Sequence, residues 1–133
     1  MFKRIVLIGM MLGMTTWHGA AQDVRPLDRV AVAFERGDVQ MLLDDAASRV
    51  EVGIYEESQL YSRAQARFVL QAFFDKHPPE RFSLHDTSKT SRGWFGEGRY
   101  WFQGKAEPVR VYFRLRKQGT AWELRELLIE YDA

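Results

Sequence analysis

The sequence predicts an α+β domain in which helices come first and a run of strands follows. Between Pro26 and Leu43, apolar residues recur three and four positions apart, the spacing of a helix with one buried face. From Phe82 to Tyr131, apolar and polar residues mostly alternate, which is the period of strands with one buried face. Helices followed by antiparallel strands imply two layers, with the apolar face of the sheet against the helices.

Three helices are predicted from their end signals. The first begins near Pro26, because the first helical position needs no N–H group. Gly37 ends it, and Asp38 can cap a second, short helix. The strongest signal is at residues 62–65, whose Ser-Arg-Ala-Gln sequence has the form of a capping box. The prolines at 78–79 end this third helix, because proline cannot donate a backbone hydrogen bond.

Strands are predicted on both sides of the third helix. Residues 49–54 alternate in polarity, and a short return strand follows around residues 60–61. Four further strands follow the two prolines, at about residues 82–84, 94–103, 109–116 and 122–131. The sequence therefore predicts six strands, most of them in the second half of the chain.

The last predicted strand breaks its own alternation. Trp122 and Leu124 have one parity, whereas Leu127 and Ile129 have the other. A β-bulge adds one residue to a strand and so reverses the parity beyond it. A bulge at residues 125–126 would place all four apolar side chains on one face.

Residues 1–21 have the order of a secretory signal peptide: a short basic start, the uncharged stretch 5–14, and small residues at 19–21. The apolar stretch is shorter than the roughly 20 residues that span a membrane. An uncleaved N-terminal anchor is the alternative. We expect export to the periplasm or the medium, and a single mature domain of residues 22–133 without membrane attachment.

Composition limits the classes of partner. The chain has 19 basic and 18 acidic residues, and removal of the signal peptide leaves 17 basic and 18 acidic residues, a net charge of −1. A chain with this net charge has no net positive electrostatic field that would attract nucleic acid or an anionic membrane. The chain has no cysteine, so disulfides cannot stabilise it. Nine Phe, five Tyr and four Trp residues can supply a core instead.

Four short segments carry a family resemblance: Tyr-Ser-Arg-Ala-Gln-Ala at 61–66, Phe-Phe at 73–74 before the two prolines, Val-Arg-Val-Tyr-Phe at 109–113, and Glu-Leu-Leu-Ile-Glu at 126–130. Their order resembles the nuclear transport factor 2-like superfamily. It is similar in particular to a family of short exported bacterial proteins known as domain of unknown function 4783. The resemblance implies a cystatin-like cone: a curved antiparallel sheet packed on two or three N-terminal helices. It implies no activity.

Some members of the superfamily are isomerases or dehydratases with a pocket between sheet and helices, which makes Asp86 and Tyr100 candidates for catalysis. Asp86 shares parity with Leu84, and Tyr100 with Phe102, so both can point inward. A carboxylate base and a phenol donor form a workable pair. The alternative is a solvated Asp86 at a strand end and a Tyr100 that belongs to the core. This alternative is the stronger, and we expect a non-catalytic module that binds a protein or a small molecule.

The opposite face of the sheet carries arginine and aromatic residues, here named the outer-face strip: Arg99, Trp101, Arg110, Tyr112 and Arg114. These residue types are enriched at interface hot spots. The resemblance implies that cones of this type pair through this face, so a homodimer is one expectation. The alternative is a solvated face on which arginines cover Trp101 and Tyr112.

Metal and cofactor sites are not expected. His18 would be removed with the signal peptide, His85 has solvent-facing parity, and His77 lies where a helix dipole favours a cation. None of the three has a partner at metal-ligand spacing. The acidic pairs at 44–45 and 56–57 supply too few oxygens for calcium and are expected to be solvated turns.

Overall fold

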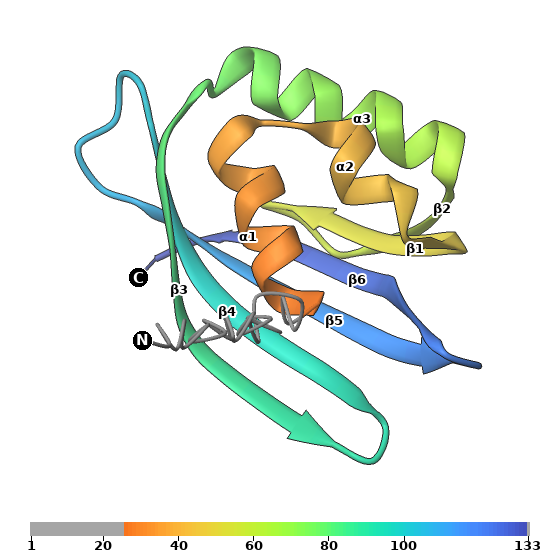
Figure 1. Ribbon diagram of the computed structural model, residues 1–133. Helices are drawn as coiled ribbons and strands as arrows, with labels where there is room; N and C mark the ends of the chain where they lie inside the picture. Colours follow the sequence, from red (N-terminus) through yellow and green to blue (C-terminus); the bar gives the residue numbers. More distant parts are fainter. Residues whose placement is uncertain (1–25, 133) are drawn as a thin grey trace, which may run out of the picture.

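Three helices lie on one face of a curved, six-stranded sheet in the computed structural model of the chain, which describes residues 26–132 (Figure 1). The predicted signal peptide lies outside the described residues. The helices are α1 (Pro26–Arg36), α2 (Val39–Asp44) and α3 (Arg63–Lys76). The strands are β1 (Ala46–Ile54), β2 (Gln59–Ser62), β3 (Pro79–Thr90), β4 (Gly93–Phe102), β5 (Val109–Gln118) and β6 (Ala121–Tyr131). The predicted α+β class is confirmed.

The strands lie side by side in the order β2-β1-β6-β5-β4-β3. All neighbouring pairs are antiparallel except β1 and β6, which run parallel. The expectation of a wholly antiparallel sheet is therefore corrected to a mixed sheet. Alternation of side chains shows which face of a strand is buried, but it carries no information about which distant strand becomes its neighbour.

The helix ends form as their sequences predict. Gly37 adopts a left-handed backbone with φ of 62°, and the Asp38 carboxylate accepts a hydrogen bond from the Met41 N–H at 3.0 Å. At the start of α3, the Ser62 hydroxyl accepts from the Gln65 N–H at 3.3 Å. The Gln65 side chain accepts from the Ser62 N–H at 3.1 Å, which completes the predicted capping box.

The core lies between the helices and the concave face of the sheet. Its centre is aromatic: the ring of Phe34 stacks on Phe82 with centroids 5.1 Å apart and meets Phe74 edge-on at 5.5 Å. Tyr100 is fully buried beside them. Each such ring, once buried, stabilises the fold by about 1.5–3 kcal/mol. Buried aromatic side chains therefore stabilise this domain, which has no disulfides.

The predicted bulge in β6 is confirmed. Arg114 of β5 pairs with Glu126, but the next residue, Leu115, pairs with Leu124, so Arg125 has no cross-strand partner. The extra residue restores parity, and Leu124 and Leu127 are both buried.

The register shift between Leu84 and Asp86 of β3 was not predicted. Leu84 pairs with Gly98 of β4, whereas Asp86 pairs with Glu97, so His85 is the extra residue. The strand also continues to Thr90, well beyond the predicted residues 82–84, and the β3–β4 hairpin extends past the helices (Figure 1). The shift turns the side chains beyond it onto the opposite face.

Candidate functional site

The residues of the outer-face strip lie on the face of the sheet that the helices leave uncovered. Arg99 and Trp101 lie on β4, and the other three residues lie on β5. Arg99 is the cross-strand partner of Arg110. The residues that alternate with the strip along the two strands, Tyr100, Val111 and Phe113, are buried in the core. Arg99 and Arg110 are exposed, whereas Trp101, Tyr112 and Arg114 are half-buried.

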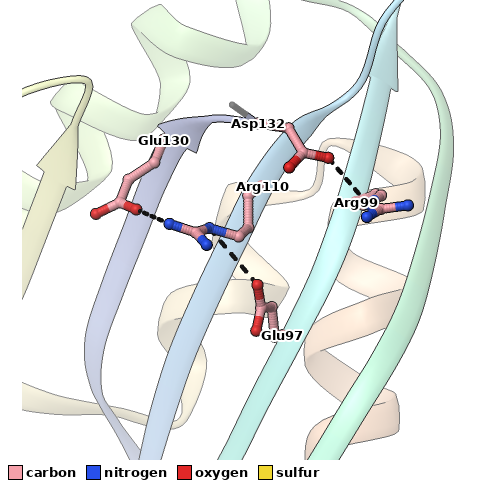
Figure 2. A network of polar contacts seen from close by, with 5 residues as sticks. All are labelled: Glu97, Arg99, Arg110, Glu130 and Asp132. Atoms are coloured by element: carbon pink, nitrogen blue, oxygen red, sulfur yellow. Dashed lines mark hydrogen bonds and ion pairs between the residues drawn. The ribbon is translucent and has the colours of Figure 1, made fainter.

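Carboxylates neutralise the exposed arginines of the strip (Figure 2). Arg110 lies between two of them, with its Nη2 atom 2.6 Å from Glu130 Oε2 and its Nε atom 3.5 Å from Glu97 Oε1. Arg99 Nε lies 3.1 Å from Asp132 Oδ2. We name these five residues, drawn together in Figure 2, the outer-face network. The hydrogen bond with Glu130 raises the pKa of Arg110.

The acidic members of the network were not among the sequence candidates. Glu97 could have been found, because it shares parity with Arg99 on the same strand. Glu130 and Asp132 required the β5–β6 register, which places Glu130 directly opposite Arg110. With these three carboxylates, the face carries charges of both signs.

Trp101 is covered by a cation, but from a neighbouring strand. The guanidinium carbon of Arg81 lies 3.9 Å from the centroid of a Trp101 ring. Arg81 and Trp101 are cross-strand partners in β3 and β4. The alternative expectation of an arginine over Trp101 is therefore met, but by Arg81 in place of an arginine of the strip.

The parallel contact of β1 and β6 adds a carboxyl pair to the outer face. Glu51 and Glu126 are cross-strand partners, which brings their carboxyl groups close together. A hydrogen bond between two carboxyl groups needs a proton on one of them. Burial raises the pKa of Glu126, hydrogen bonding with Glu51 raises it further, and Arg114 acts to lower it. The pKa of the neighbouring Tyr112 is raised by burial and by Glu126.

The two catalytic candidates lie on opposite faces of the sheet. Tyr100 is buried in the core, where its hydroxyl donates a hydrogen bond to the His77 carbonyl and burial raises its pKa. Asp86 is exposed on the outer face beside Glu97, because the His85 bulge reverses its parity. The predicted base and donor therefore do not meet.

His77 also differs from expectation. The helix dipole favours a cation at this position, yet burial lowers the pKa of His77, and Lys76 and Lys105 lower it further. Its ring instead packs against Phe102, with centroids 4.4 Å apart. In the part of the chain that the structure describes, no group of three or more His, Asp or Glu side chains is placed to hold a metal ion.

A cavity of about 290 Å³ opens between the helices and the end of the sheet. Its wall is mainly apolar and comes from α1, α2, β5 and β6, with Val30, Leu42 and Trp122 among the lining residues. Arg29 and Asp45 add an ion pair to the wall, with Nε and Oδ2 2.9 Å apart. The resemblance implied a pocket between sheet and helices, but no sequence signal marked these lining residues, because they come from separate elements that meet only in the fold.

Residues 27–130 match the family model of a domain of unknown function, DUF4783. The chain belongs to this family. The resemblance seen in the four sequence segments is thus confirmed. No curated protein matches the chain. Within residues 26–132, no helix combines the length and apolar character that crossing a membrane requires.

Solved structures support the same fold for this DUF4783 domain. A DUF4783 family protein from Bacteroides ovatus is 22% identical, with a TM-score of 0.73 over 79% of this chain and 94% of its own. A cystatin-like protein of unknown function from Nostoc punctiforme is 16% identical, with a TM-score of 0.61 over 80% and 85%. A chain whose name includes NTF2 is 18% identical, with a TM-score of 0.60 over 76% and 90%. The predicted cystatin-like and nuclear transport factor 2-like class is therefore correct.

Proposed function

We propose that this DUF4783 domain is a non-catalytic binding module that pairs with a second copy of itself through the outer sheet face. The observation that carries the proposal is the balance of charge on that face. The outer-face network and Arg81 together hold three arginines and three carboxylates. A two-fold interface brings a patch against its own copy, so the patch must be complementary to itself. Interleaved charges of both signs meet this requirement.

Aromatic side chains supply the apolar part of the proposed interface. Trp101 and Tyr112 lie half-buried among the charged groups, on neighbouring strands. Large aromatic residues surrounded by polar groups are typical of interface hot spots. The core supports a binding role as well, because every buried side chain in residues 26–132 is hydrophobic, and the one buried hydroxyl, that of Tyr100, already bonds to His77.

Sedimentation equilibrium of the mature domain tests the proposal, and we expect the mass of a dimer. Trp101→Ala with Tyr112→Ala should raise the dissociation constant more than about tenfold, because hot-spot truncations cost about 2 kcal/mol or more. Phe68→Ala is a matched control, since Phe68 is 78% exposed on α3, away from this face. Circular dichroism confirms that the variants are folded. A monomeric wild type at every concentration would overturn the proposal.

Ligand binding in the cavity between α1, α2 and the sheet is a second candidate. Its volume of about 290 Å³ is near the lower end of ligand pockets, and its wall is mostly apolar. Such a cavity suits a small apolar compound. Titration with toluene, followed by amide NMR, should shift the signals of Trp122 and Leu124. Met41→Trp should fill the cavity and abolish the shifts; if the shifts persist in that variant, toluene binds elsewhere.

We also propose that the domain acts after export, in the periplasm or outside the cell. The support is the order of basic, apolar and small residues in residues 1–21. This proposal is independent of the partner that the outer face binds.

A further inference from the structure

A hollow of about 520 Å³ lies where the β3–β4 turn meets the end of β5. It is lined by Ser91, Arg92, Arg114, Arg116 and Lys117, and we name it the basic hollow. Four of its five residues carry a positive charge, although the whole chain is nearly neutral with 19 basic and 18 acidic residues. Such a local concentration of one sign of charge is not explained by composition.

The strand register brings these cations together. Trp94 of β4 pairs with Leu115 of β5, so the turn before β4 lies beside the residues after Leu115. The approach is close: a Cβ atom on Gly93 would lie 2.0 Å from the Leu115 carbonyl oxygen, so only glycine fits there. The Arg92 N–H donates to the Thr90 hydroxyl at 3.1 Å, which holds the turn. Arg92 is thereby placed next to Arg116 and Lys117.

Carboxylates do not neutralise the hollow as they neutralise the outer-face network. Within residues 26–132, no ion pair involves Arg92, Arg116 or Lys117. Glu123 lies opposite Arg116 in the β5–β6 register, but its ion pair is with Arg125, at 3.5 Å between Oε2 and Nη2.

Arg114 differs from the other cations of the hollow. It lies opposite Glu126 and interacts with that carboxyl group. Three positive charges of the hollow therefore have no counterion within the described chain, and their mutual repulsion opposes the fold. A bound anion would remove this repulsion.

We propose that the basic hollow binds an oxyanion of the phosphate class. The planar guanidinium fork donates two parallel hydrogen bonds to such a group, and three arginines line the hollow. The Lys117 ammonium and the Ser91 hydroxyl can donate further bonds. The ligand should be compact, because the near-neutral chain provides no extended field for a long polyanion. The proposal does not depend on dimer formation.

Titration with pyrophosphate, followed by amide NMR and calorimetry, tests the site in the mature domain. We expect shifts confined to residues 91–93 and 114–117, and an affinity that falls as salt is added. Arg92→Gln with Lys117→Gln should weaken binding by about tenfold or more, because each bond to a charged group is strong. Arg67→Gln with Lys76→Gln is the matched control: it removes the same charges from exposed positions on α3 and should leave binding unchanged.

A second arm identifies the source of the phosphate group. Vesicles of phosphatidylglycerol and of phosphatidylcholine are tested for co-sedimentation with the domain. Binding to phosphatidylglycerol vesicles that the Arg92 and Lys117 variant loses would indicate a lipid headgroup, and binding to pyrophosphate alone would indicate a soluble ester. Two results overturn the site: no binding in either arm, or binding that both double variants weaken equally. A monomeric protein that binds pyrophosphate would contradict the proposed dimer and leave this site standing.

Discussion

Glu126 on β6 lies opposite Glu51 on β1 across the parallel pair of strands, and burial and hydrogen bonding with Glu51 raise the pKa of Glu126. Arg114 of β5 faces the same pair, and Tyr112 lies beside it. No other pair of strands in residues 26–132 runs parallel. The parallel contact between the two parts of the sheet therefore carries a titratable carboxyl pair.

This pair predicts a pH dependence of stability. The pKa of Glu126 is raised in the fold above its ordinary value of 4.5, so the fold favours the protonated form. Protonated Glu126 therefore stabilises the fold fully at pH values below the pKa that Glu126 has in the unfolded chain. This stabilisation is lost as the pH rises through the higher pKa that Glu126 has in the fold. Glu126→Gln cannot ionise, so urea unfolding of this variant should depend less on pH between about 4 and 7.

The effect should stay below about 1 kcal/mol, because solvent screens this partly exposed pair. Glu51→Gln should act in the same direction, and the two substitutions should not be additive. Glu57→Gln, in an exposed turn, is the control. Parallel pH profiles for the wild type and Glu126→Gln would show that the two groups do not share a proton.

Tyr100→Phe should destabilise the domain by about 1–2 kcal/mol. The Tyr100 hydroxyl donates to the His77 carbonyl, and its removal leaves that carbonyl without this donor while the ring still fills the core. Urea denaturation monitored by circular dichroism measures the change. Tyr61→Phe is a suitable control, because the Tyr61 hydroxyl donates to the Gln59 side chain at an exposed position. Equal stability of Tyr100→Phe and the wild type would mean that the buried bond contributes nothing.

Gly96→Ala should destabilise the domain by about 1–3 kcal/mol through overpacking. A Cβ atom at this position would lie 2.6 Å from the Phe113 ring and 3.3 Å from a Leu27 methyl group of α1. The thermal midpoint should fall, and Phe113→Leu in the same chain should recover part of the loss by removing the ring. If the losses of stability from the two single substitutions simply add up in the double variant, a clash with the Phe113 ring is not the cause of the destabilisation.

Expression of the full chain in a bacterium tests the predicted signal peptide. Residues 19–21 supply the small side chains that signal peptidase requires, so the exported protein should begin at Gln22. An intact mass measured from the periplasmic fraction checks the cleavage. Ala21→Leu should slow it, because the cleavage site needs a small residue. Protein that retains Met1 in the membrane fraction would support the uncleaved anchor instead.

The short-range features of this domain follow from the sequence alone. The capping box at Ser62 and Gln65, the left-handed Gly37 and the alternation of β5 each depend on a few neighbouring residues, and all are found in the structure. The bulge at Arg125 was predictable for the same reason, because only an inserted residue puts the apolar side chains of β6 on one face.

The tertiary structure decided which distant residues meet. The parallel contact that brings Glu51 to Glu126, and the register that sets Glu130 against Arg110, join segments far apart in the chain. The bulge at His85 places Asp86 on the face opposite to Tyr100, and no break in the hydrophobic pattern of the sequence predicts this bulge. Helix caps and strand faces are set by local bonding and burial, whereas the neighbour of a strand is chosen by the packing of the whole sheet. The sequence therefore determined the elements and their buried faces, and only the assembled sheet determined the sites on its outer face.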